Sequence, residues 1–357
     1  MMEQGLQQFR ERIVAAGASQ TALRIQGGAT KNWYGQSLQG ELLDTRAYTG
    51  IVAYEPTELV ITARCGTPLA EIEAALDAQH QMLAFEPPHF GATATLGGVV
   101  ASGLSGPRRA AAGAVRDFML GAVLMDGKGE KLRFGGQVMK NVAGYDVSRL
   151  LAGSLGTLGL LLEMSLKVLP KPFAETTLRF EMTQADALQR LNQWGGQPLP
   201  ISASAWHDGV LLLRLSGAQA AVSAARQLLG GEEVADAAPI WLALREQSNA
   251  FFADIRPDAA GLWRLSVPSV TAPLALDGEQ LIEWGGAQRW LKTDADAAVI
   301  RAAAAAAGGH ATLFRGGDKR SGVFHPLAPA VMAIHRKLKS GFDPAGIFNP
   351  GRMYDQL

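Results

Sequence analysis

The hydrophobic positions in the first half of the chain follow helical and extended patterns in turn. Residues 3–17 predict an amphipathic helix that ends at Gly17, with an apolar face formed by Leu6, Phe9, Ile13 and Val14. A second helix is expected from Leu69 to Gln79, because Pro68 before it suits a helix start. Apolar runs between turn residues predict strands at 22–26, 41–44, 50–55, 59–65, 118–126, 129–134 and 157–169. Asp126-Gly127-Lys128-Gly129 predicts a hairpin between two of them.

The second half of the chain has a β-α-β-β-α-β order, which is typical of a ferredoxin-like unit with an antiparallel sheet. We expect this first unit as strand 175–182, helix 184–194, strands 201–206 and 209–216, helix 218–230 and strand 232–236. A weaker second copy is expected as helix 240–252, three strands between 262 and 293, helix 294–307 and strand 310–315. A final helix is expected at 327–340. Pro170-Lys171-Pro172 lies between the halves and is the predicted domain boundary.

Charge and composition exclude several classes of protein. Lys plus Arg and Asp plus Glu are balanced at 33 each, so nothing attracts the whole chain to nucleic acid or to an anionic membrane. No apolar stretch reaches the roughly 20 residues of a membrane helix, and the first residues lack the features of a signal peptide. We therefore expect a cytoplasmic protein that reaches the inner membrane only through partners.

The single cysteine, Cys65, excludes an internal disulfide framework. It lies in an apolar, strand-like run, which favours a buried and inert thiol over a nucleophile or a flavin attachment point. One cysteine also cannot ligate an iron–sulfur cluster.

Two glycine-rich runs about seventy residues apart, Gln26–Asn32 and Ala94–Gly103, are the strongest chemical signal. Glycine lets backbone approach a ligand closely, and successive free amides in tight turns form concavities that favour anions. Further donors are available on Thr30, Lys31, Asn32, Thr95 and Ser102. The pair predicts a site for a phosphorylated cofactor, although each run alone is also compatible with an ordinary turn. The fingerprints of Rossmann and P-loop proteins are absent, so another architecture is expected.

The order of motifs around these runs resembles the FAD-binding domain of the vanillyl-alcohol oxidase and p-cresol methylhydroxylase (PCMH) superfamily. The matching motifs are Gly27–Thr30, Glu55–Leu69, Thr95–Gly103 and Gly153–Gly159, and the tail Phe342–Arg352 is similar to that of the D-2-hydroxyacid dehydrogenase branch. Within that branch, Lys140–Asp146 and Leu244–Gln247 most resemble FAD-binding subunits of bacterial glycolate oxidases. The resemblance implies an α+β chain with three parts. These are a two-part PCMH-type FAD-binding domain at 1–170, a smaller α+β cap domain with an antiparallel ferredoxin-like sheet at 171–339, and a tail at 340–357 that returns to the FAD domain.

The resemblance also implies the cofactor and its contacts. The pyrophosphate of FAD would lie on Gly27, Gly28, Ala29, Thr30, Lys31 and Asn32. The ribityl chain and flavin ring would lie along Thr95, Gly97, Gly98, Ala101, Ser102, Gly103, Ser105, Gly113, Val115 and Arg116. Leu160 would face the adenine, and Asn349 would donate to the flavin, unless Asn349-Pro350-Gly351 is a plain turn. Ala29 and Thr30 stand where relatives with covalent flavin carry histidine, so non-covalent FAD is expected; His89 is either a flavin neighbour or an ordinary loop residue.

Groups for substrate chemistry are harder to identify. The six histidines show no metal-ligand spacing, so no metal site is predicted. The segment 314–326 concentrates cations and is a candidate carboxylate site, with Arg315, Lys319 or Arg320 as the cation and His325 as the base, unless it is a solvated loop. Lys140 and Tyr145 are secondary candidates for the flavin face.

Three functions remain open. The first is the FAD subunit of a glycolate oxidase (dehydrogenase) complex that oxidises glycolate to glyoxylate. The resemblance then implies a larger paralogous FAD subunit and an iron–sulfur subunit that receives the electrons. The second is a self-sufficient FAD-dependent 2-hydroxyacid dehydrogenase. The third is an assembly subunit that keeps the fold but binds no FAD.

Overall fold

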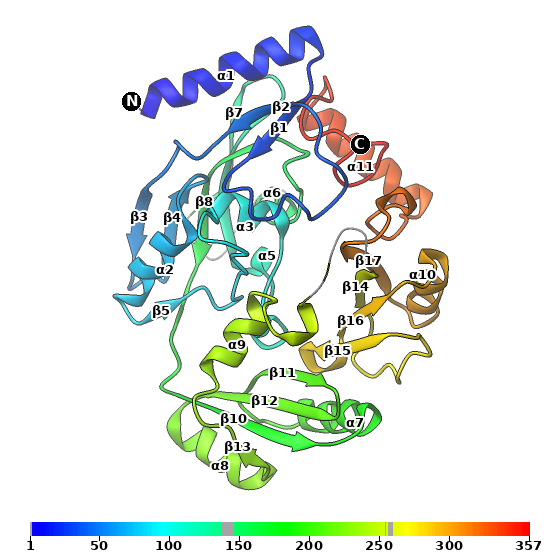
Figure 1. Ribbon diagram of the computed structural model, residues 1–357. Coiled ribbons are helices and arrows are strands. Elements are labelled where there is room, and N and C mark those ends of the chain that lie inside the picture. Colours follow the sequence, from blue (N-terminus) through cyan, green and yellow to red (C-terminus); the bar gives the residue numbers. More distant parts are fainter. Residues whose placement is uncertain (1, 137–145, 254, 256–259) are drawn as a thin grey trace.

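The computed structural model describes residues 2–136, 146–253, 255 and 260–357. Figure 1 shows an N-terminal body coloured blue to cyan, a cap coloured green to orange, and a red C-terminal segment that lies back against the first body. The mixed architecture and the α+β class agree with the prediction. The predicted strands and the hairpin at Asp126 are also present in the first body.

The N-terminal body consists of two sheet-containing parts. Its elements are α1 (Met2–Ser19), β1 (Leu23–Gln26), β2 (Glu41–Asp44), β3 (Ile51–Glu55), β4 (Val60–Arg64), α2 (Leu69–Asp77), β5 (Gln81–Met82), α3 (Leu96–Ser102), α4 (Arg109–Ala112), α5 (Val115–Phe118), β6 (Met119–Met125), β7 (Lys131–Gly135), α6 (Val147–Leu150), β8 (Leu160–Lys167) and β9 (Leu169–Pro170). Strands β1 and β2 pair in parallel, and β5 pairs with β9. A five-stranded antiparallel sheet has the order β3-β4-β8-β6-β7.

Helix α1 differs from its prediction at two points. It continues past Gly17 to Ser19, because Gln20, with a φ of +55°, adopts the left-handed conformation that follows the helix end. Its buried apolar face is Phe9, Ile13 and Ala16. Val14, predicted on that face, is 48% exposed, because it lies one residue off this spacing.

The cap is built on one eight-stranded antiparallel sheet. Its elements are β10 (Ala174–Glu181), α7 (Gln184–Gly195), β11 (Ile201–His207), β12 (Val210–Gly217), α8 (Gln219–Leu229), β13 (Glu232–Glu233), α9 (Ala238–Arg245), η1 (Ala250–Phe252), β14 (Gly261–Ser266), β15 (Glu279–Glu283), η2 (Trp284–Gly286), β16 (Gln288–Thr293), α10 (Ala297–Ala306), β17 (His310–Arg315) and η3 (Lys319–Ser321). The strand order is β13-β10-β12-β11-β15-β16-β14-β17. The sheet consists of two halves, β10–β13 and β14–β17, and the strands of each half lie in the ferredoxin-like spatial order. The second strands of the two halves, β11 and β15, pair with each other and so join the halves edge to edge.

The second ferredoxin-like half is less regular than the first. The predicted helix 240–252 is the shorter α9 followed by a single 3-10 turn, because Gln247 has a φ of +51° and ends the helical path. The described segment 267–278 between β14 and β15 contains no helix. The two-residue β13 replaces the predicted strand 232–236.

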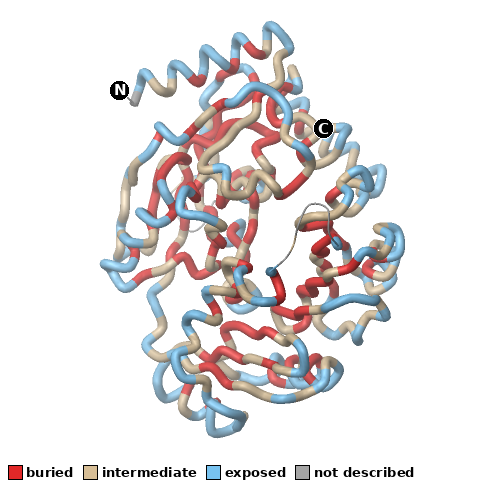
Figure 2. Tube along the Cα trace, in the orientation of Figure 1, coloured by how far each residue is buried: buried red, intermediate tan, exposed pale blue. Residues whose placement is uncertain are grey.

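Four buried clusters hold these layers together, and Figure 2 shows that buried residues concentrate in the sheets and the segments between them. One cluster fills the N-terminal body, and two lie between the cap sheet and its helices α7, α8 and α10. The fourth cluster joins Tyr34 and Leu104 of the N-terminal body to Trp290 and Phe314 of the cap. The cap sheet therefore packs on the N-terminal body through a shared core.

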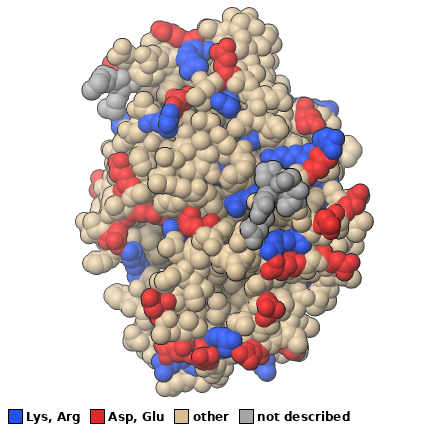
Figure 3. All heavy atoms as spheres, viewed as in Figure 1, with Lys and Arg blue, Asp and Glu red and all other residues tan. Residues whose placement is uncertain are grey.

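The C-terminal segment begins with α11 (Pro329–Phe342), which was predicted as a helix at 327–340. This helix ends three residues beyond the predicted end of the cap at residue 339. After this helix, Phe348 forms a parallel bridge with Leu23 of β1, so the tail lies beside the first strand (Figure 1). The buried ammonium of Lys339 fixes this return by donating to Asp343 and to the carbonyls of Thr157 and Phe348, at 2.6–2.8 Å. Figure 3 shows basic and acidic side chains interspersed on the face that it draws, which agrees with the balanced composition.

Candidate functional site: a backbone cradle beside a cationic cavity

The first glycine run forms an open turn directly after β1. We call residues 26–32 the cradle. Ala29 within it has a φ of +61°, in the left-handed region. Among the described residues, the amides of Gly27 through Lys31 donate no hydrogen bond to the protein. Successive amides around a left-handed residue form a concavity that suits an anion, so the cradle has the chemistry of a phosphate site.

Glycine is required in the cradle because a second segment lies against it. A Cβ added to Gly28 would overlap the carbonyl of Thr93, and a Cβ on Gly27 would overlap the Thr95 hydroxyl. The Thr93 hydroxyl also donates to the carbonyl of Gly28 at 2.7 Å. The two glycine runs therefore lie against each other and line the same cavity.

The second run forms a helix, where its glycines had suggested a tight turn. Residues Leu96–Ser102 are α3, and the Thr95 hydroxyl caps its first turn by accepting from Gly98. The amides of Leu96 and Gly97 donate to the carbonyls of Thr67 and Cys65, at 3.0 and 2.8 Å. These glycines serve close helix packing, since a Cβ on Gly97 would lie 2.8 Å from the Cβ of Cys65.

The cradle and α3 line two adjoining narrow cavities of about 90 and 70 Å³. Predicted cofactor residues that line them are Gly27, Gly28, Ala29, Thr30, Lys31, Asn32, Thr95, Gly97, Gly98, Ala101, Ser102, Leu160 and Asn349. The remaining predicted residues lie elsewhere. Gly103 is the left-handed cap that ends α3, and Ser105 lines a small void of about 20 Å³ between the two bodies. Gly113, Val115 and Arg116 line none of these cavities, but the amide of Val115 donates to the Ser105 hydroxyl at 3.2 Å.

Lys31 adds a cation to the cradle. Its ammonium donates to the carbonyl of His89 at 3.1 Å and lies over the ring of Phe90. Burial lowers the pKa of Lys31 to about 8, although the Glu246 carboxylate partly opposes this effect. Glu246 of the cap also accepts from the amides of His89 and Phe90, at 2.8–3.2 Å, and so fixes the neighbouring turn. The His89 ring contacts Glu73 at 2.9 Å.

Asn349 closes the cavity from the C-terminal tail. Its side-chain carbonyl accepts from the amide of Ile25 at 2.9 Å, and its side-chain nitrogen donates to Leu155 at 2.6 Å. Asn349 has a φ of +40°, which asparagine tolerates better than most residues. The Asn349 side chain thus connects β1 to the Leu155 segment, and it lines both narrow cavities.

A larger cavity of about 980 Å³ lies beside the cradle and is lined by Trp33, Ser37, Phe90, Gly91, Glu246, Ile255, Arg315, Gly316, Gly317, Asp318 and Lys319. The Arg315 guanidinium stacks 4.1 Å from the Trp33 ring centroid and donates to Gln247 at 3.1 Å. Its buried Nε has no hydrogen-bond partner within the described chain, and burial lowers its pKa to about 10. Arg315 is the candidate cation best placed to meet an anion in this cavity.

The other three candidates from segment 314–326 have different surroundings. Lys319 lines the cavity, but its ammonium donates to the carbonyls of Trp33 and Gly35 at 2.7 and 2.8 Å. Arg320 points to solvent, 92% exposed, and pairs with Asp318. His325 lies outside the cavity lining and accepts a long bond of 3.4 Å from Ala311. The structure therefore brings together Arg315 and Lys319 but not Arg320 and His325.

Several other predictions concern residues away from these cavities or outside the description. Lys140 and Tyr145 lie outside the described residues. Cys65 is buried, and burial raises the pKa of its thiol to about 12, as expected for an inert cysteine. Within the described ranges, no group of three histidine, cysteine or acidic side chains is placed to hold a metal.

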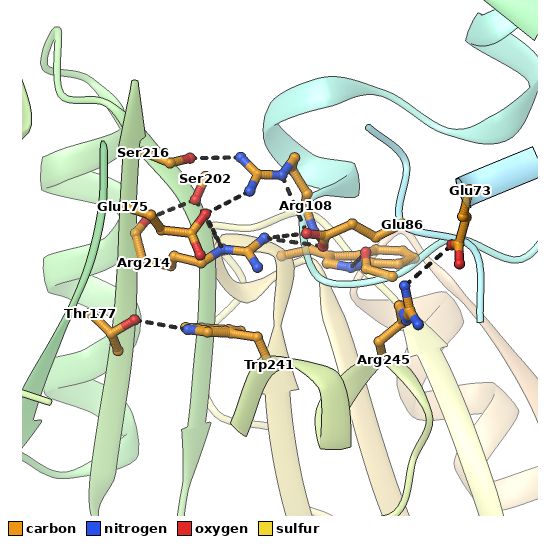
Figure 4. A network of polar contacts seen from close by, with 12 residues as sticks. Glu73, Glu86, Arg108, Glu175, Thr177, Ser202, Arg214, Ser216, Trp241 and Arg245 are labelled. Carbon is orange, nitrogen blue, oxygen red and sulfur yellow. Dashed lines mark hydrogen bonds and ion pairs between the residues drawn. The ribbon is translucent and has the colours of Figure 1, made fainter. Parts of the chain in front are cut away.

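An ion network fastens the cap to Glu86 and Arg108 of the N-terminal body (Figure 4). The Glu86 carboxylate, from the N-terminal body, accepts from Arg108 and from Arg214 of β12, at 2.8–3.3 Å. Arg108 in turn contacts Glu175 and Ser216 of the cap, at 2.8 and 2.6 Å. No sequence motif indicated this network, because its members are isolated polar residues brought together by two separate sheets.

Residues 5–135 match the family described as FAD binding domain. Over 351 residues the chain is 52% identical to the glycolate oxidase subunit GlcE of Escherichia coli, covering 98% of both chains. It is 32% identical to D-lactate dehydrogenase of Anaerostipes hadrus over 133 residues, or 37% of this chain and 28% of that one. The glycolate oxidase subunit GlcD of Bacillus subtilis is 40% identical over 84 residues, covering 24% and 18% of the two chains.

The fold is also found in solved structures. Alkyldihydroxyacetonephosphate synthase superposes with a TM-score of 0.64 at 16% identity, covering 96% of this chain and 74% of that chain. This likeness extends through the FAD-binding body and the cap. None of the described helices combines the length and the apolar character needed to cross a bilayer. The near-complete match at 52% identity shows the family: this chain is an FAD-dependent oxidoreductase of the family that includes the glycolate oxidase subunit GlcE.

Proposed function

We propose that this chain is the FAD-binding subunit of a complex that oxidises glycolate to glyoxylate. The observation that carries the proposal is the cradle, in which the amides of Gly27 through Lys31 are left without a described partner beside a lysine. The kinship with GlcE supports glycolate as the substrate class. The complex would include a larger paralogous FAD subunit and an iron–sulfur subunit that takes the electrons, with the membrane reached only through these partners.

The residues that line the two narrow cavities beside the cradle have the chemistry to bind FAD. The cradle amides and the Lys31 ammonium would hold the diphosphate, since backbone donors and a cation both favour an anion. The α3 residues Gly98 and Ala101 form a smooth wall, and Leu160 offers an apolar surface for the adenine. When bound, FAD supplies the acceptor for the hydride that leaves a 2-hydroxyacid. Ala29 and Thr30 offer no histidine for covalent attachment, so the cofactor would be held non-covalently.

The large cavity contains only part of the machinery that substrate oxidation needs. Arg315 would bind a carboxylate, and its unpartnered Nε is available for one further hydrogen bond. The lining residues that the structure describes include no histidine, and Glu246 is already engaged by two amides and by Arg245. These observations favour a chain that works with a partner over a self-sufficient 2-hydroxyacid dehydrogenase.

Anaerobic flavin spectroscopy tests the proposal. We expect the purified chain to bind FAD at one per chain and to release it on denaturation. Glycolate should bleach the flavin absorbance in the complex but not in the isolated chain. Bleaching of the isolated chain by glycolate or D-lactate would instead establish the self-sufficient enzyme. A chain that gains no absorbance when FAD is added would establish an assembly subunit.

The partners are tested by affinity purification of the chain from its native source. We expect a second, larger flavoprotein and a protein with the broad absorbance of iron–sulfur clusters to elute with it. Recovery of the chain alone, from extracts that oxidise glycolate, would contradict the proposed complex.

A further inference from the structure

The turn at the end of the cradle, residues 32–36, shares Asn32 with it and is held by two cations from distant parts of the chain. Lys319 of the cap donates to the carbonyls of Trp33 and Gly35, at 2.7 and 2.8 Å. Arg352 of the tail donates to the carbonyl of Asn32 at 2.9 Å and to that of Gln36. Four carbonyls of one short turn are thus engaged by two side chains.

The same turn has further constraints that make its position specific. The amide of Gln36 donates back to the carbonyl of Arg352 at 3.0 Å, so the tail and the turn form a reciprocal pair. Gly35 has a φ of +87°, and a Cβ there would lie 3.0 Å from the same carbonyl. The Asn32 side chain donates to Gln26 at 2.9 Å and joins the two ends of the cradle. Any shift of residues 32–36 is therefore passed to the cradle.

Neither cation forms an ion pair with a carboxylate of the described residues. Arg352 is 5% exposed and lines the cradle cavity, and no carboxylate of the described residues lies within 4.0 Å of its guanidinium or of the Lys319 ammonium. Burial lowers the pKa of both groups, and for Lys319 the charge of Arg352 adds to this effect. Arg352 is buried and Lys319 is half-buried, and buried cations are ordinarily paired, so the two together create a positive field beside the cradle amides.

We propose that Lys319 and Arg352 are positioning residues for the phosphate cradle. They hold four carbonyls of residues 32–36, and so keep the cradle amides free for the diphosphate, with the cap and the tail each supplying one cation. This role replaces substrate binding for Lys319, whose ammonium is largely used by the two carbonyls. The inference rests on the proposed FAD site, and its test includes a measurement made without FAD.

Hydrogen–deuterium exchange on the FAD-free full-length chain measures the positioning directly. The amides of Asn32, Tyr34 and Gln36 are hydrogen-bonded and so report on the turn. We expect Lys319→Met and Arg352→Lys each to speed exchange of a peptide covering residues 32–36 by about tenfold or more, because each loses bonds from a charged donor. A peptide from β8 should be unaffected. Arg320→Met, at an exposed neighbouring position, is the matched control and should change neither peptide.

FAD titration of the same variants, together with Arg352→Met, connects the turn to the cofactor. We expect the dissociation constant of FAD to rise by roughly 10- to 100-fold for Arg352→Met and less for Arg352→Lys, which keeps the charge but not the fork. Riboflavin, which lacks the diphosphate, should show no such change. Unchanged exchange, or faster exchange with unchanged FAD affinity, would overturn the inference. If the parent chain binds no FAD, the proposed function fails, while the exchange result still decides whether the two cations position the turn.

Discussion

At the scale of single residues, Gly28 has the least freedom in the cradle. A side chain at this position would occupy the space of the Thr93 carbonyl, which is backbone and cannot rotate away. We expect Gly28→Ala to displace the cradle, to destabilise the chain by about 1–3 kcal/mol as overpacking usually does, and to abolish FAD binding. Flavin absorbance per chain and chemical unfolding measure the two effects. Gly5→Ala, in open space on α1, is the control and should be neutral or slightly stabilising.

Lys31 predicts opposite pH dependences for stability and for cofactor binding. Its folded pKa of about 8 lies below its ordinary value of 10.5, so between these values the unfolded chain holds a proton that the folded chain has released. The contribution of Lys31 to FAD-free stability therefore rises with pH across this window. FAD affinity should fall across pH 8, because the cradle loses a positive charge. Unfolding curves and FAD titrations from pH 7 to 10 measure both slopes.

The control for this pH dependence is Lys31→Met, which should lose both slopes while the fold persists. Lys31→Arg should keep its charge and bind FAD with little change over the same range. An FAD affinity that stays constant between pH 7 and 10 in the parent chain would contradict a role for the Lys31 charge.

The residue scale also shows what sequence can reveal about such a site. The cradle was predictable, because two adjacent glycines and a nearby lysine supply free amides and a cation, and the second glycine run supplies a facing wall. Arg352 was visible only as part of a tail motif, because its role depends on contact with a turn more than 300 positions away. Lys319 was assigned to substrate because a cation in a loop gives no indication of the carbonyls that it meets.

At the scale of elements, the ion network between Glu86 and Arg214 fixes the cap sheet to the N-terminal body (Figure 4). Arg214 is nearly fully buried, with 4% of its side chain exposed, and its other carboxylate partner, Glu175, is 3.9 Å away. Loss of the Glu86 carboxylate therefore leaves a poorly compensated buried charge. We expect Glu86→Gln to cost about 3–5 kcal/mol in the free energy of unfolding. The paired variant Glu86→Gln with Arg214→Gln should cost less than the two single changes added together, as chemical denaturation in a double-mutant cycle can show.

The matched control for this network lies on the neighbouring strand. Arg179 of β10 pairs with Glu181 and Glu232 on the surface, at 2.9 and 3.2 Å, so Arg179→Gln should lower the free energy of unfolding far less than Glu86→Gln does. Equal costs at the buried and exposed pairs would show that the network is not what fastens the cap.

Elements differ in how well the sequence predicts them. Apart from its last strand, the first ferredoxin-like half was predicted to within one residue at each end. Turn residues separate its apolar runs, and Thr183 caps its first helix by accepting from the amide of Asp186. Helix α3 was missed because glycine-rich sequence favours loops, although Thr95 and Gly103 cap its two ends; its close packing against Cys65 accounts for the glycines within it. The joining of the two halves through β11 and β15 is a long-range pairing that no local pattern records.

At the scale of the whole molecule, the shared aromatic core argues against independent unfolding of the two bodies. Trp33 of the N-terminal body and Trp290 of the cap both contact Phe314, at ring-centroid distances of 5.0 and 4.8 Å. Phe314 is 2% exposed, so Phe314→Ala should cost about 3–5 kcal/mol and shift the entire transition.

We therefore expect one cooperative transition, in which tryptophan fluorescence and far-ultraviolet circular dichroism coincide along a denaturant gradient. Val299→Ala, on the exposed face of α10, should leave the midpoint unchanged and serves as the control, since Val299 is 56% exposed. Two separated transitions would mean that the predicted boundary at residue 170 divides units that fold alone. Coincident transitions would mean that the cradle, the cap cation Lys319 and the tail cation Arg352 belong to one cooperative structure, which a cofactor site assembled from all three segments requires.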